Sequence, residues 1–428
     1  MKSDGSPGRL RPGLRVLVTE GSSTSARQNL YALAYAGAVI DVCDSNARFC
    51  MARYSRYVRK CYRCPLFTTA PEAYLQFLEE RLRAEKYDIL FPVHDEIFLV
   101  SRCRERLAAR AALAVANFEA LERLQSKAEF MRLLVELNLP HPPTVFVRSG
   151  RDLKHACAFP CYIKLAYSTA GRGVFLVHNA EERDAVANRL EAEGRLTGDA
   201  EILVQRPAPG LLSVVQTVFQ HGRLVAGHCY QARAMGVGGS ARARISVSHP
   251  LVLQHLAAIG ARLSWHGALM IDYLWDPASA QPAYIDANPR IGETFNATLS
   301  GLNLCAILVQ VALDQPLTPH GPGRAGTRTH SILMTLLAGA QEGQSRLALA
   351  AELGRGLSHQ GIYAGSEEEL TRPRDDLLSL IPALWITGRV LIDPRAAERL
   401  VNKTVHNYAL SEKAAQAIRR LGAPGEET

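Results

Sequence analysis

Short apolar runs alternate with an amphipathic segment in the first part of the chain. Residues 14–19 (LRVLVT) and 39–42 are apolar runs of strand length, and apolar side chains recur at helical spacing between them, up to Gly37. A strand, a helix and a strand within about 30 residues predict a βαβ unit, which requires a parallel sheet. Residues 87–93 (YDILFPV) predict another buried strand. We therefore predict a doubly wound α/β scaffold in this region.

Polar residues follow two of these predicted strands. Residues 21–25 read GSSTS, and residues 94–96 read HDE. Ligands of open α/β sheets bind at the carboxyl ends of the strands, so both segments are candidates to line a substrate site. A solvated loop is the alternative for residues 94–96. The GSSTS turn lacks both G-x-G-x-x-G and the Lys-Ser/Thr pair of a Walker loop, so we predict no nucleotide site there.

The next region combines a capped helix with a glycine-rich loop between two strands. Residues 126–129 (SKAE) form a capping box, which predicts the start of a helix. Residues 159–166 and 174–178 are apolar strands, joined by YSTAGRG. Such a loop can act as a flap whose backbone N–H groups fold over phosphates, although a plain hairpin turn has a similar sequence. Lys164 favours the flap, because an apolar strand rarely carries an unpaired lysine.

A second glycine-rich loop carries arginines on both sides. The predicted strand at residues 201–205 and a hairpin at residues 213–230 precede the loop MGVGGS at residues 235–240. Arg233 lies before this loop, and Arg242 and Arg244 follow it. Three arginines around a flexible loop indicate anion capture or lid closure, with a solvated loop as the alternative.

A later hairpin carries oxygen-bearing side chains on one face. Two apolar runs, residues 268–275 and 283–288, flank a Pro-rich turn. Folding this hairpin about Ser279 places Asp272 opposite Asp286, and Asn288 shares the strand face of Asp286. Carboxylates beside an amide oxygen suit Mg²⁺, and Arg290 at the strand end would hold phosphate oxygens. For any one residue a solvated strand end is the better interpretation, but the set together favours a metal site.

The last hundred residues contain mostly helical patterns. We predict helices at residues 329–349 and 394–421 and a short strand near residues 361–364. Residues 377–392 are strongly apolar and could form a core helix, a partner surface or a shallow membrane contact, of which we favour the core. We predict no chemistry in this region.

Composition narrows the function further. The chain has 428 residues, enough for two or three domains, and a net charge of +8, which favours anionic ligands. It has no low-complexity basic arm, so nucleic acid is not indicated, and no run of roughly 18 apolar residues that would span a membrane. The nine irregularly spaced cysteines predict reduced thiols in a cytoplasmic protein, and the lone CxxC at residues 61–64 lacks the second ligand pair of a zinc site.

The order of these features resembles that of the ATP-grasp superfamily, in particular the bacterial carboxylate–amine ligase type, which is related to the ATP-binding domain of the carbamoyl-phosphate synthetase large chain. Residues 286–292 (DANPRIG) and 301–304 (GLNL) nearly match the pattern E-x-N-P-R-x-G followed by G-x-N of that type. The resemblance covers residues 14–319. It implies a Rossmann-like pre-ATP-grasp domain (14–118) and two ATP-grasp subdomains (119–205 and 206–319). The Gly/Pro/Ser/Arg-rich residues 1–13 predict a disordered tail, and residues 320–428 form a mainly helical extension in this prediction.

The resemblance also implies a site that holds ATP with one or two Mg²⁺, for which Mn²⁺ could substitute. Asp272, Asp286 and Asn288 would hold the metal, and Arg290 with Arg242 or Arg244 would steady the transferred phosphoryl group. The residues expected to contact ATP are two phosphate-binding lysines, the flap and an adenine-binding hinge: Lys127, Lys164, Ser168, Thr169, Ala170, Gly171, Gly173, Val204, Gln205, Arg206 and Ala208.

By this resemblance the protein is an ATP-dependent ligase that activates a carboxylate as an acyl phosphate and joins it to an amine. Its partners would be small-molecule substrates, and the resemblance also implies a homodimer. One alternative is a bicarbonate-activating enzyme of the carboxylase or carbamoyl-phosphate type, although the chain has neither a biotinyl Met-Lys motif nor a second synthetase half. Another is a non-catalytic nucleotide-binding protein, which two departures favour: Asp286 in place of the usual Glu, and Arg206 in place of an acidic hinge residue.

Overall fold

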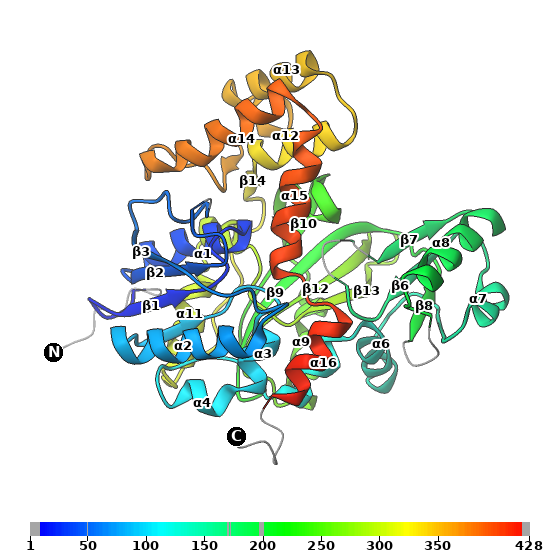
Figure 1. Cartoon of the computed structure of the whole chain (residues 1–428), viewed down its shortest axis with the longest axis horizontal. Helices are drawn as coiled ribbons and strands as arrows, with labels where there is room; N and C mark the ends of the chain where they lie inside the picture. The colour runs from blue at the N-terminus through cyan, green and yellow to red at the C-terminus, as the bar shows by residue number, and fades with distance from the viewer. Residues whose placement is uncertain (1–8, 49, 169–170, 172, 197–200, 422–428) are drawn as a thin grey trace.

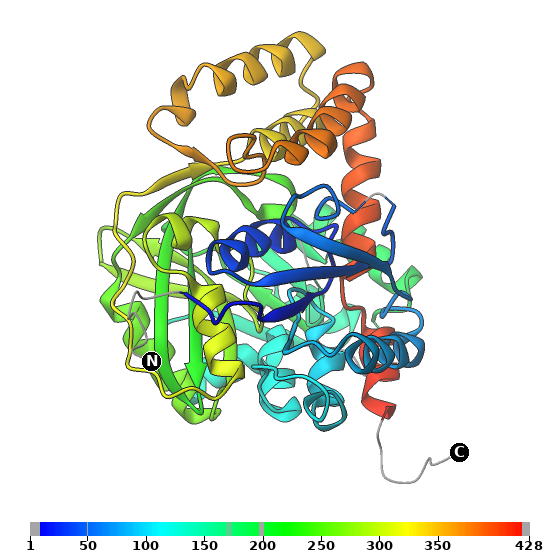
Figure 2. The same ribbon diagram turned by 90° about the vertical axis from the view of Figure 1, so that its left-hand side faces the viewer.

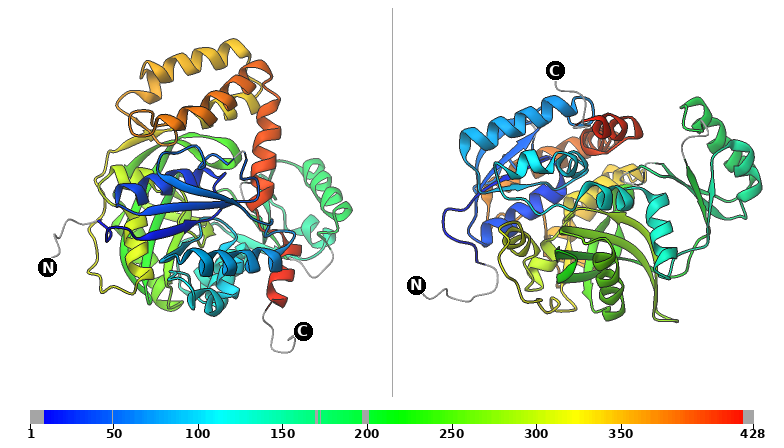
Figure 3. Two further views of the ribbon diagram at one scale, coloured as in Figure 1. Left: turned by 60° about the vertical axis from the view of Figure 1, so that its left-hand side comes forward. Right: turned by 90° about the horizontal axis from the view of Figure 1, so that it is seen from below.

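A computed structural model describes residues 9–48, 50–168, 171, 173–196 and 201–421. Of the tail predicted for residues 1–13, residues 1–8 lie outside this part. Figure 1 shows an N-terminal part on the left, a separate lobe on the right and a helical cap at the top, all arranged around a central sheet. The view from below in Figure 3 shows how far the lobe stands off from the rest.

The N-terminal sheet is parallel throughout and has the strand order β3-β2-β1-β4. The predicted doubly wound scaffold is therefore confirmed. Helix α1 begins after Ser23, whose hydroxyl accepts a hydrogen bond from the Ala26 N–H. The elements of this part are β1 (Arg15–Val18), α1 (Thr24–Tyr35), β2 (Val39–Asp44), β3 (Val58–Arg63), α2 (Pro71–Glu85), β4 (Ile89–Phe91), α3 (Ile97–Arg102) and α4 (Arg104–Ala108).

The lobe is a four-stranded antiparallel sheet in the order β5-β8-β6-β7. Alternate side chains of its strands pack on opposite faces. Ile163 and Val204 belong to the core under the lobe's helices, whereas Lys164 and Gln205 lie on the other face. The elements are α5 (Phe118–Gln125), α6 (Lys127–Glu136), β5 (Thr144–Val147), α7 (Gly150–Ala156), β6 (Cys161–Leu165), β7 (Val174–Val177), α8 (Ala180–Ala192) and β8 (Ile202–Gln205).

The central sheet has seven strands in the order β13-β12-β9-β10-β11-β14-β15. The two predicted hairpins, β9–β10 and β12–β13, are both present. The helices α10 and α11 are separate, and Gly301 between them has a φ of 94°. The elements are β9 (Leu211–Gln220), β10 (Arg223–Met235), η1 (Val237–Gly239), β11 (Ala241–Val247), α9 (Pro250–Arg262), β12 (Gly267–Asp276), β13 (Gln281–Asn288), α10 (Phe295–Leu299), α11 (Leu304–Ala312), β14 (Arg328–His330) and β15 (Glu367–Glu368).

The rest of the chain forms the helical cap and then crosses the front of the molecule (Figure 2 shows the cap above the sheet). The strands β14 and β15 of this region join the central sheet, so the region is not a separate appendage. The predicted domain boundaries remain predictions. None of the described helices combines the length and the apolar character needed to cross a bilayer. The remaining elements are α12 (Ile332–Gln341), α13 (Arg346–Leu357), η2 (Gly361–Tyr363), η3 (Leu377–Ser379), α14 (Leu380–Ile392), α15 (Ala396–Tyr408) and α16 (Glu412–Arg420).

Two predictions for this region are wrong. The strand expected near residues 361–364 is the 3-10 helix η2, because Gly361 takes a φ of 62° and starts a turn. The helix α14 was expected in the core, yet Val390 is its only buried residue. An apolar stripe alone does not say whether the chain itself or a partner covers it.

A buried arginine fastens the C-terminal region to α1. The Arg27 guanidinium donates to Asp376 Oδ2 at 3.2 Å and to the carbonyl oxygens of Tyr54 at 3.0 Å and Met51 at 3.3 Å. Arg27 and Asp376 are both fully buried. Removing one member of such a pair leaves the other charge without its partner in a low-dielectric interior.

We expect Arg27→Met to lower the free energy of unfolding by about 3–5 kcal/mol, because Asp376 would stay buried without its counter-charge. Urea unfolding followed by circular dichroism measures this change. The control is Arg399→Met, which removes an exposed pair with Asp393 and should leave the stability nearly unchanged. Equal effects of the two substitutions would contradict the prediction.

Candidate active site

The hairpin β12–β13 brings the three predicted metal-binding residues together. Asp272 pairs directly with Asp286, as predicted, and a register shift between Asp272 and Tyr273 brings these two residues opposite each other. Asn288 lies next to them, with its Nδ2 at 3.4 Å from Asp272 Oδ2. Two carboxylates and one amide oxygen are thus gathered on one sheet face.

The electrostatics of this group fit a divalent cation. Burial, followed by the like charge of Asp286, raises the pKa of Asp272 to about 7, and Arg290 and the two lysines only partly offset this. A cation between the carboxylates would relieve both effects. Among the described residues no three His, Cys, Asp or Glu side chains gather as a metal site. The donor set therefore depends on Asn288, and its hard oxygens suit Mg²⁺.

Lys127 links the lobe to this hairpin. It is the first residue of α6, where the Ser126 hydroxyl accepts a hydrogen bond from the Glu129 N–H, as the capping box predicted. Its Nζ donates to Asp286 Oδ1 at 2.9 Å and to the Ser168 carbonyl oxygen at 3.0 Å. One buried ammonium group therefore contacts both the proposed metal strand and the flap.

Lys164 lies beside it on β6 and is also buried. Its Nζ donates to Gln205 Oε1 at 2.6 Å and approaches the Ile285 carbonyl oxygen at 3.4 Å. The Gln205 amide is oriented in turn by Thr144 Oγ1 at 2.9 Å. Desolvation lowers the pKa of Lys164 from 10.5 to about 8, against the raising effect of Asp286. The sequence indicated both Lys164 and Gln205, but not that they bind each other.

The flap closes towards the second glycine-rich loop. Gly173 accepts a hydrogen bond from the Leu165 N–H at 2.8 Å, which completes the β6–β7 hairpin. A Cβ placed on Gly171 would lie 3.1 Å from the Gly238 carbonyl oxygen, so the two loops touch. Thr169 and Ala170, also predicted flap residues, lie outside the described part of the chain.

The predicted hinge follows β8. The Val204 side chain packs into the core of the lobe, on the face opposite Gln205, and its backbone lies between β5 and β6. Arg206 has an exposed side chain, and its N–H donates to the Pro143 carbonyl oxygen at 3.0 Å. Ala208 lies partly exposed in the turn beyond it. The hinge thus offers main-chain groups rather than an acidic side chain.

The three predicted catalytic arginines point to different neighbours. Arg290 is buried, and its Nη1 lies 2.9 Å from Asp95 Oδ1 at the end of β4. The Arg244 guanidinium is held by Glu293 and Glu369. Arg242 lies near Glu352 of α13, whose pKa it helps to lower. Only Arg290 lies in the cluster with the lysines and the metal-binding residues.

The segment 94–96 is buried, so the solvated-loop alternative is wrong. Asp95 pairs with Arg290 as described, and Glu96 accepts hydrogen bonds from the N–H groups of Val93 and His94. Burial and the charge of Arg290 hold the pKa of His94 well below its usual value, so its imidazole is neutral. Within the described part of the chain neither ring nitrogen has a hydrogen-bond partner.

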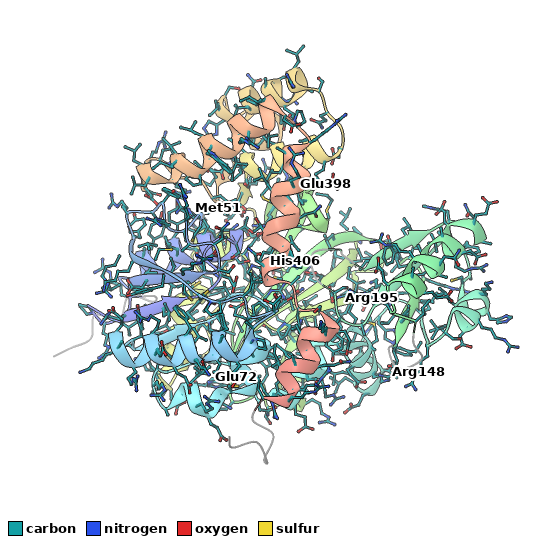
Figure 4. All side chains as sticks on the ribbon, viewed as in Figure 1. Met51, Glu72, Arg148, Arg195, Glu398 and His406 are labelled. Atoms are coloured by element: carbon teal, nitrogen blue, oxygen red, sulfur yellow. The ribbon has the colours of Figure 1, made fainter. Side chains whose placement is uncertain are left out.

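The C-terminal region supplies contacts that the sequence did not reveal. Helix α15, on which Figure 4 labels Glu398 and His406, crosses the front of the molecule. At its end Tyr408 stacks on His94 with ring centroids 4.0 Å apart, and the Leu410 N–H donates to Asp95 at 2.9 Å. Arg419 of α16 donates to the Tyr167 hydroxyl beside the flap at 2.7 Å. No local spacing signals these contacts, because their partners lie hundreds of residues away.

Known proteins are similar to this chain in sequence and in fold. No protein-family model matches the chain. The formate-dependent phosphoribosylglycinamide formyltransferase of Bordetella parapertussis is 25% identical over 261 residues, which are 58% of this chain and 54% of that protein. The D-aspartate ligase of Enterococcus faecium is 23% identical over 268 residues, 56% of this chain and 62% of that protein. The chain thus spans little more than half the length of these curated relatives.

Solved structures share the fold over a larger part of the chain. The L-amino acid ligase from Bacillus licheniformis superposes with a TM-score of 0.56 at 15% identity, over 72% of this chain and 76% of that one. The ADP complex of N5-carboxyaminoimidazole ribonucleotide synthetase gives a TM-score of 0.58 at 15% identity, over 80% and 88%. At these identities the likeness concerns the fold, and it confirms the predicted fold class.

The lowered pKa of Lys164 predicts a pH-dependent stability. Between pH 8 and pH 10.5 the unfolded chain binds this proton and the folded chain does not, so rising pH stabilises the fold. Relative to Lys164→Met, the wild-type free energy of unfolding should therefore increase by up to about 3 kcal/mol across this interval. Urea unfolding at several pH values measures the difference. The control is Lys154→Met, an exposed lysine of α7, and a flat difference for Lys164→Met would refute the prediction.

Proposed function

The chain has the ATP-grasp fold, and from this premise we propose that it is an ADP-forming ligase that joins a carboxylate to an amine. One observation carries the proposal: the paired carboxylates Asp272 and Asp286 face two buried lysines from the other lobe. Such a pocket of opposed charges fits a metal-bound polyphosphate. The curated relatives named above include a D-aspartate ligase and a formate-dependent enzyme. Aspartate and formate are both carboxylates.

In the proposed reaction, a carboxylate oxygen of the substrate attacks the γ-phosphorus of ATP, and ADP leaves with the electron pair of the broken P–O bond. The amine then attacks the acyl carbon, phosphate leaves, and the nitrogen loses a proton. Asp272, Asp286 and Asn288 would hold Mg²⁺, which neutralises phosphate charge and orients the phosphates. The protein's remaining task is positioning and electrostatic stabilisation, so no side chain need form a covalent intermediate.

Each side chain then has a defined task. Lys127 and Lys164 would neutralise phosphate oxygens, and the hinge backbone at Val204–Ala208 would bind adenine. Arg290, which is paired with Asp95, would stabilise the acyl phosphate next to the pocket for the amine acceptor. The flap, meeting the loop at Gly238, would exclude the water that hydrolyses acyl phosphates.

The acceptor pocket in this proposal lies between the end of β4 and the segment 292–296, under α15. The neutral imidazole of His94 and the ring of Tyr408 stacked on it would contribute to its lining. Both substrates would be small molecules. The nine cysteines are free thiols, which supports a reducing compartment such as the cytoplasm.

The test is ADP release with Mg²⁺ and a panel of amino acids offered as acids and as amines. We expect stimulation by at least one acid–amine pair and formation of the amide, detected by mass spectrometry. Binding of Mg·ATP without stimulation by any pair would favour a non-catalytic nucleotide-binding protein. Stimulation by bicarbonate alone would favour a carboxylating enzyme.

The metal assignment has its own prediction. Asp286→Ala and Asn288→Ala should each reduce Mg²⁺-dependent ATP turnover by at least about a hundredfold, because each removes a donor that stabilises phosphate charge through the metal. The matched control is Asp276→Asn, a partly exposed carboxylate at the turn of the same hairpin, which should retain activity. Full turnover by either alanine variant would show that the metal lies elsewhere.

A further inference from the structure

The CxxC at residues 61–64 is a motif that the proposed function does not use. Cys61 lies on β3, and Cys64 directly follows this strand. Successive residues of a strand point to opposite faces of the sheet, so residues three apart do not face each other. Cys61 packs against the apolar core that contains Val42, whereas Cys64 belongs to the core on the other face. The two cysteines of the motif are therefore separated by the sheet.

Each of these cysteines interacts with a different thiol from the neighbouring segment. Strand β2 lies beside β3, which forms an edge of the N-terminal sheet (Figure 1). On one face Cys64 interacts with Cys43 of β2. On the other face Cys61 interacts with Cys50 in the loop between β2 and β3. The sheet thus carries one pair of thiols on each face, and all four thiols are free.

The position of the Cys50–Cys61 pair follows from the backbone. Val42 of β2 is the register partner of Cys61, and partners in a parallel ladder project to the same face. A Cβ placed on Gly21 would lie 2.6 Å from Cys50 Sγ and 3.5 Å from Val42 Cβ, so the Cys50 sulfur lies on this face beside Val42. The Cys61 thiol donates to the Ala47 carbonyl oxygen of the same loop at 3.9 Å. The loop after β2 therefore folds back over the strand that carries Cys61.

The two thiols of this pair differ in protonation and in exposure. A hydrogen bond from Cys50 lowers the pKa of Cys61, and the charge of Arg53 acts in the same direction against the effect of burial. The Arg53 guanidinium donates to the Ala47 carbonyl oxygen at 3.4 Å, which holds its charge beside the Cys61 thiol. Burial and the hydrogen bond to Cys61 raise the pKa of Cys50. Cys61 is partly exposed and Cys50 is buried. A reactive thiolate next to a protected second thiol is the arrangement of redox-active cysteines.

Two other thiol pairs have the opposite electrostatics. A hydrogen bond with Cys64, together with burial, raises the pKa of Cys43. In the lobe, burial and a hydrogen bond with Cys161 raise the pKa of Cys157 to about 12. The thiolate is the nucleophile, so Cys43 and Cys157 stay protonated and react slowly near neutral pH. Both pairs are internal controls for the reactivity of Cys61.

We propose that Cys61 and Cys50 form a redox-active pair that a hydroperoxide oxidises to a disulfide. The Cys61 thiolate attacks the terminal peroxide oxygen, the O–O bond breaks, and the alcohol or water leaves after it takes up a proton. This step leaves a sulfenic acid on Cys61. The Cys50 thiol then loses its proton and attacks the Cys61 sulfur, the S–O bond breaks, and water leaves. The two sulfurs have together given two electrons to the peroxide, and a thiol reductant reverses the reaction.

Oxidation would also move the loop that carries Cys50. The sulfur atoms of a disulfide lie about 2.05 Å apart, so the bond draws Cys50 towards β3. Cys50 packs against Gly21, and the Ala52 N–H donates to the Gly21 carbonyl oxygen at 3.0 Å. The turn after β1 would therefore respond to the redox state of the pair. None of the residues assigned to ATP or the metal takes part, so the inference stands or falls separately from the proposed ligase activity.

The test is treatment of the reduced full chain with a small excess of hydrogen peroxide, followed by blocking of the remaining thiols and tryptic digestion without reductant. Trypsin cleaves the segment 48–63 so that Cys50, Cys61 and Cys64 lie on separate peptides. We expect mass spectrometry to find peptides 49–53 and 61–63 joined by a disulfide that dithiothreitol reduces. The absence of this cross-link would overturn the proposal, as would a main cross-link of Cys64 to Cys61 or to Cys43.

Variants identify the attacking and the resolving thiol. Cys61→Ser should slow the loss of thiols to peroxide by at least about tenfold, because it removes the thiolate. Cys50→Ser should leave a sulfenic acid on Cys61, which dimedone labels on peptide 61–63. The matched control is Cys157→Ser, at another partly exposed cysteine, which should change neither result. Because Cys61 is partly exposed, its serine variant should keep the wild-type thermal unfolding, and wild-type rates of thiol loss in that folded variant would contradict the proposal.

Discussion

The pairing of β12 with β13 is the constraint on which the candidate site depends. It holds two carboxylates side by side, and burial followed by the like charge of Asp286 raises the pKa of Asp272. Strand hydrogen bonds fix this register, and a shift by one residue would turn Asp286 to the other face of the sheet. Lys127 and Lys164 of the lobe partly neutralise this negative charge from the opposite side. The site therefore lies where two sheets face each other with side chains of opposite charge.

The C-terminal region supplies interaction partners for buried residues in the other parts of the molecule. Arg27, Arg244 and His94 come from three different elements, and each finds its partner in residues beyond 360. Asp376 and Glu369 are buried, so these two partners cannot be exchanged for water without loss of stability. The cap and the crossing helices α15 and α16 thus hold the N-terminal sheet, the central sheet and the flap side of the lobe in one arrangement.

Local sequence patterns predicted the features of the molecule that depend on residues close together in the chain. The hairpin pattern predicted the pairing of Asp272 with Asp286, although the register shift that completes this pair has no signal in the sequence. A lysine in an apolar strand marked Lys164 as a site residue. The contact of Glu369 with Arg244 and the stacking of Tyr408 on His94 could not be predicted, because they depend on how distant segments pack. The exposure of α14 was missed for a different reason: its apolar stripe is identical whether the chain itself or another molecule covers it.

The buried ion pair of Arg27 with Asp376 has a consequence for modularity. A domain that evolves by fusion usually touches its host through an exposed, replaceable surface and can be cut off or transplanted. Here the connection runs through a charge inside α1 and two strands inside the central sheet. Transfer of the helical cap to another scaffold would have to bring an arginine in the first helix and a free sheet edge with it. The cap is thus tied to this molecule by buried contacts and is not a unit that could be transferred by itself.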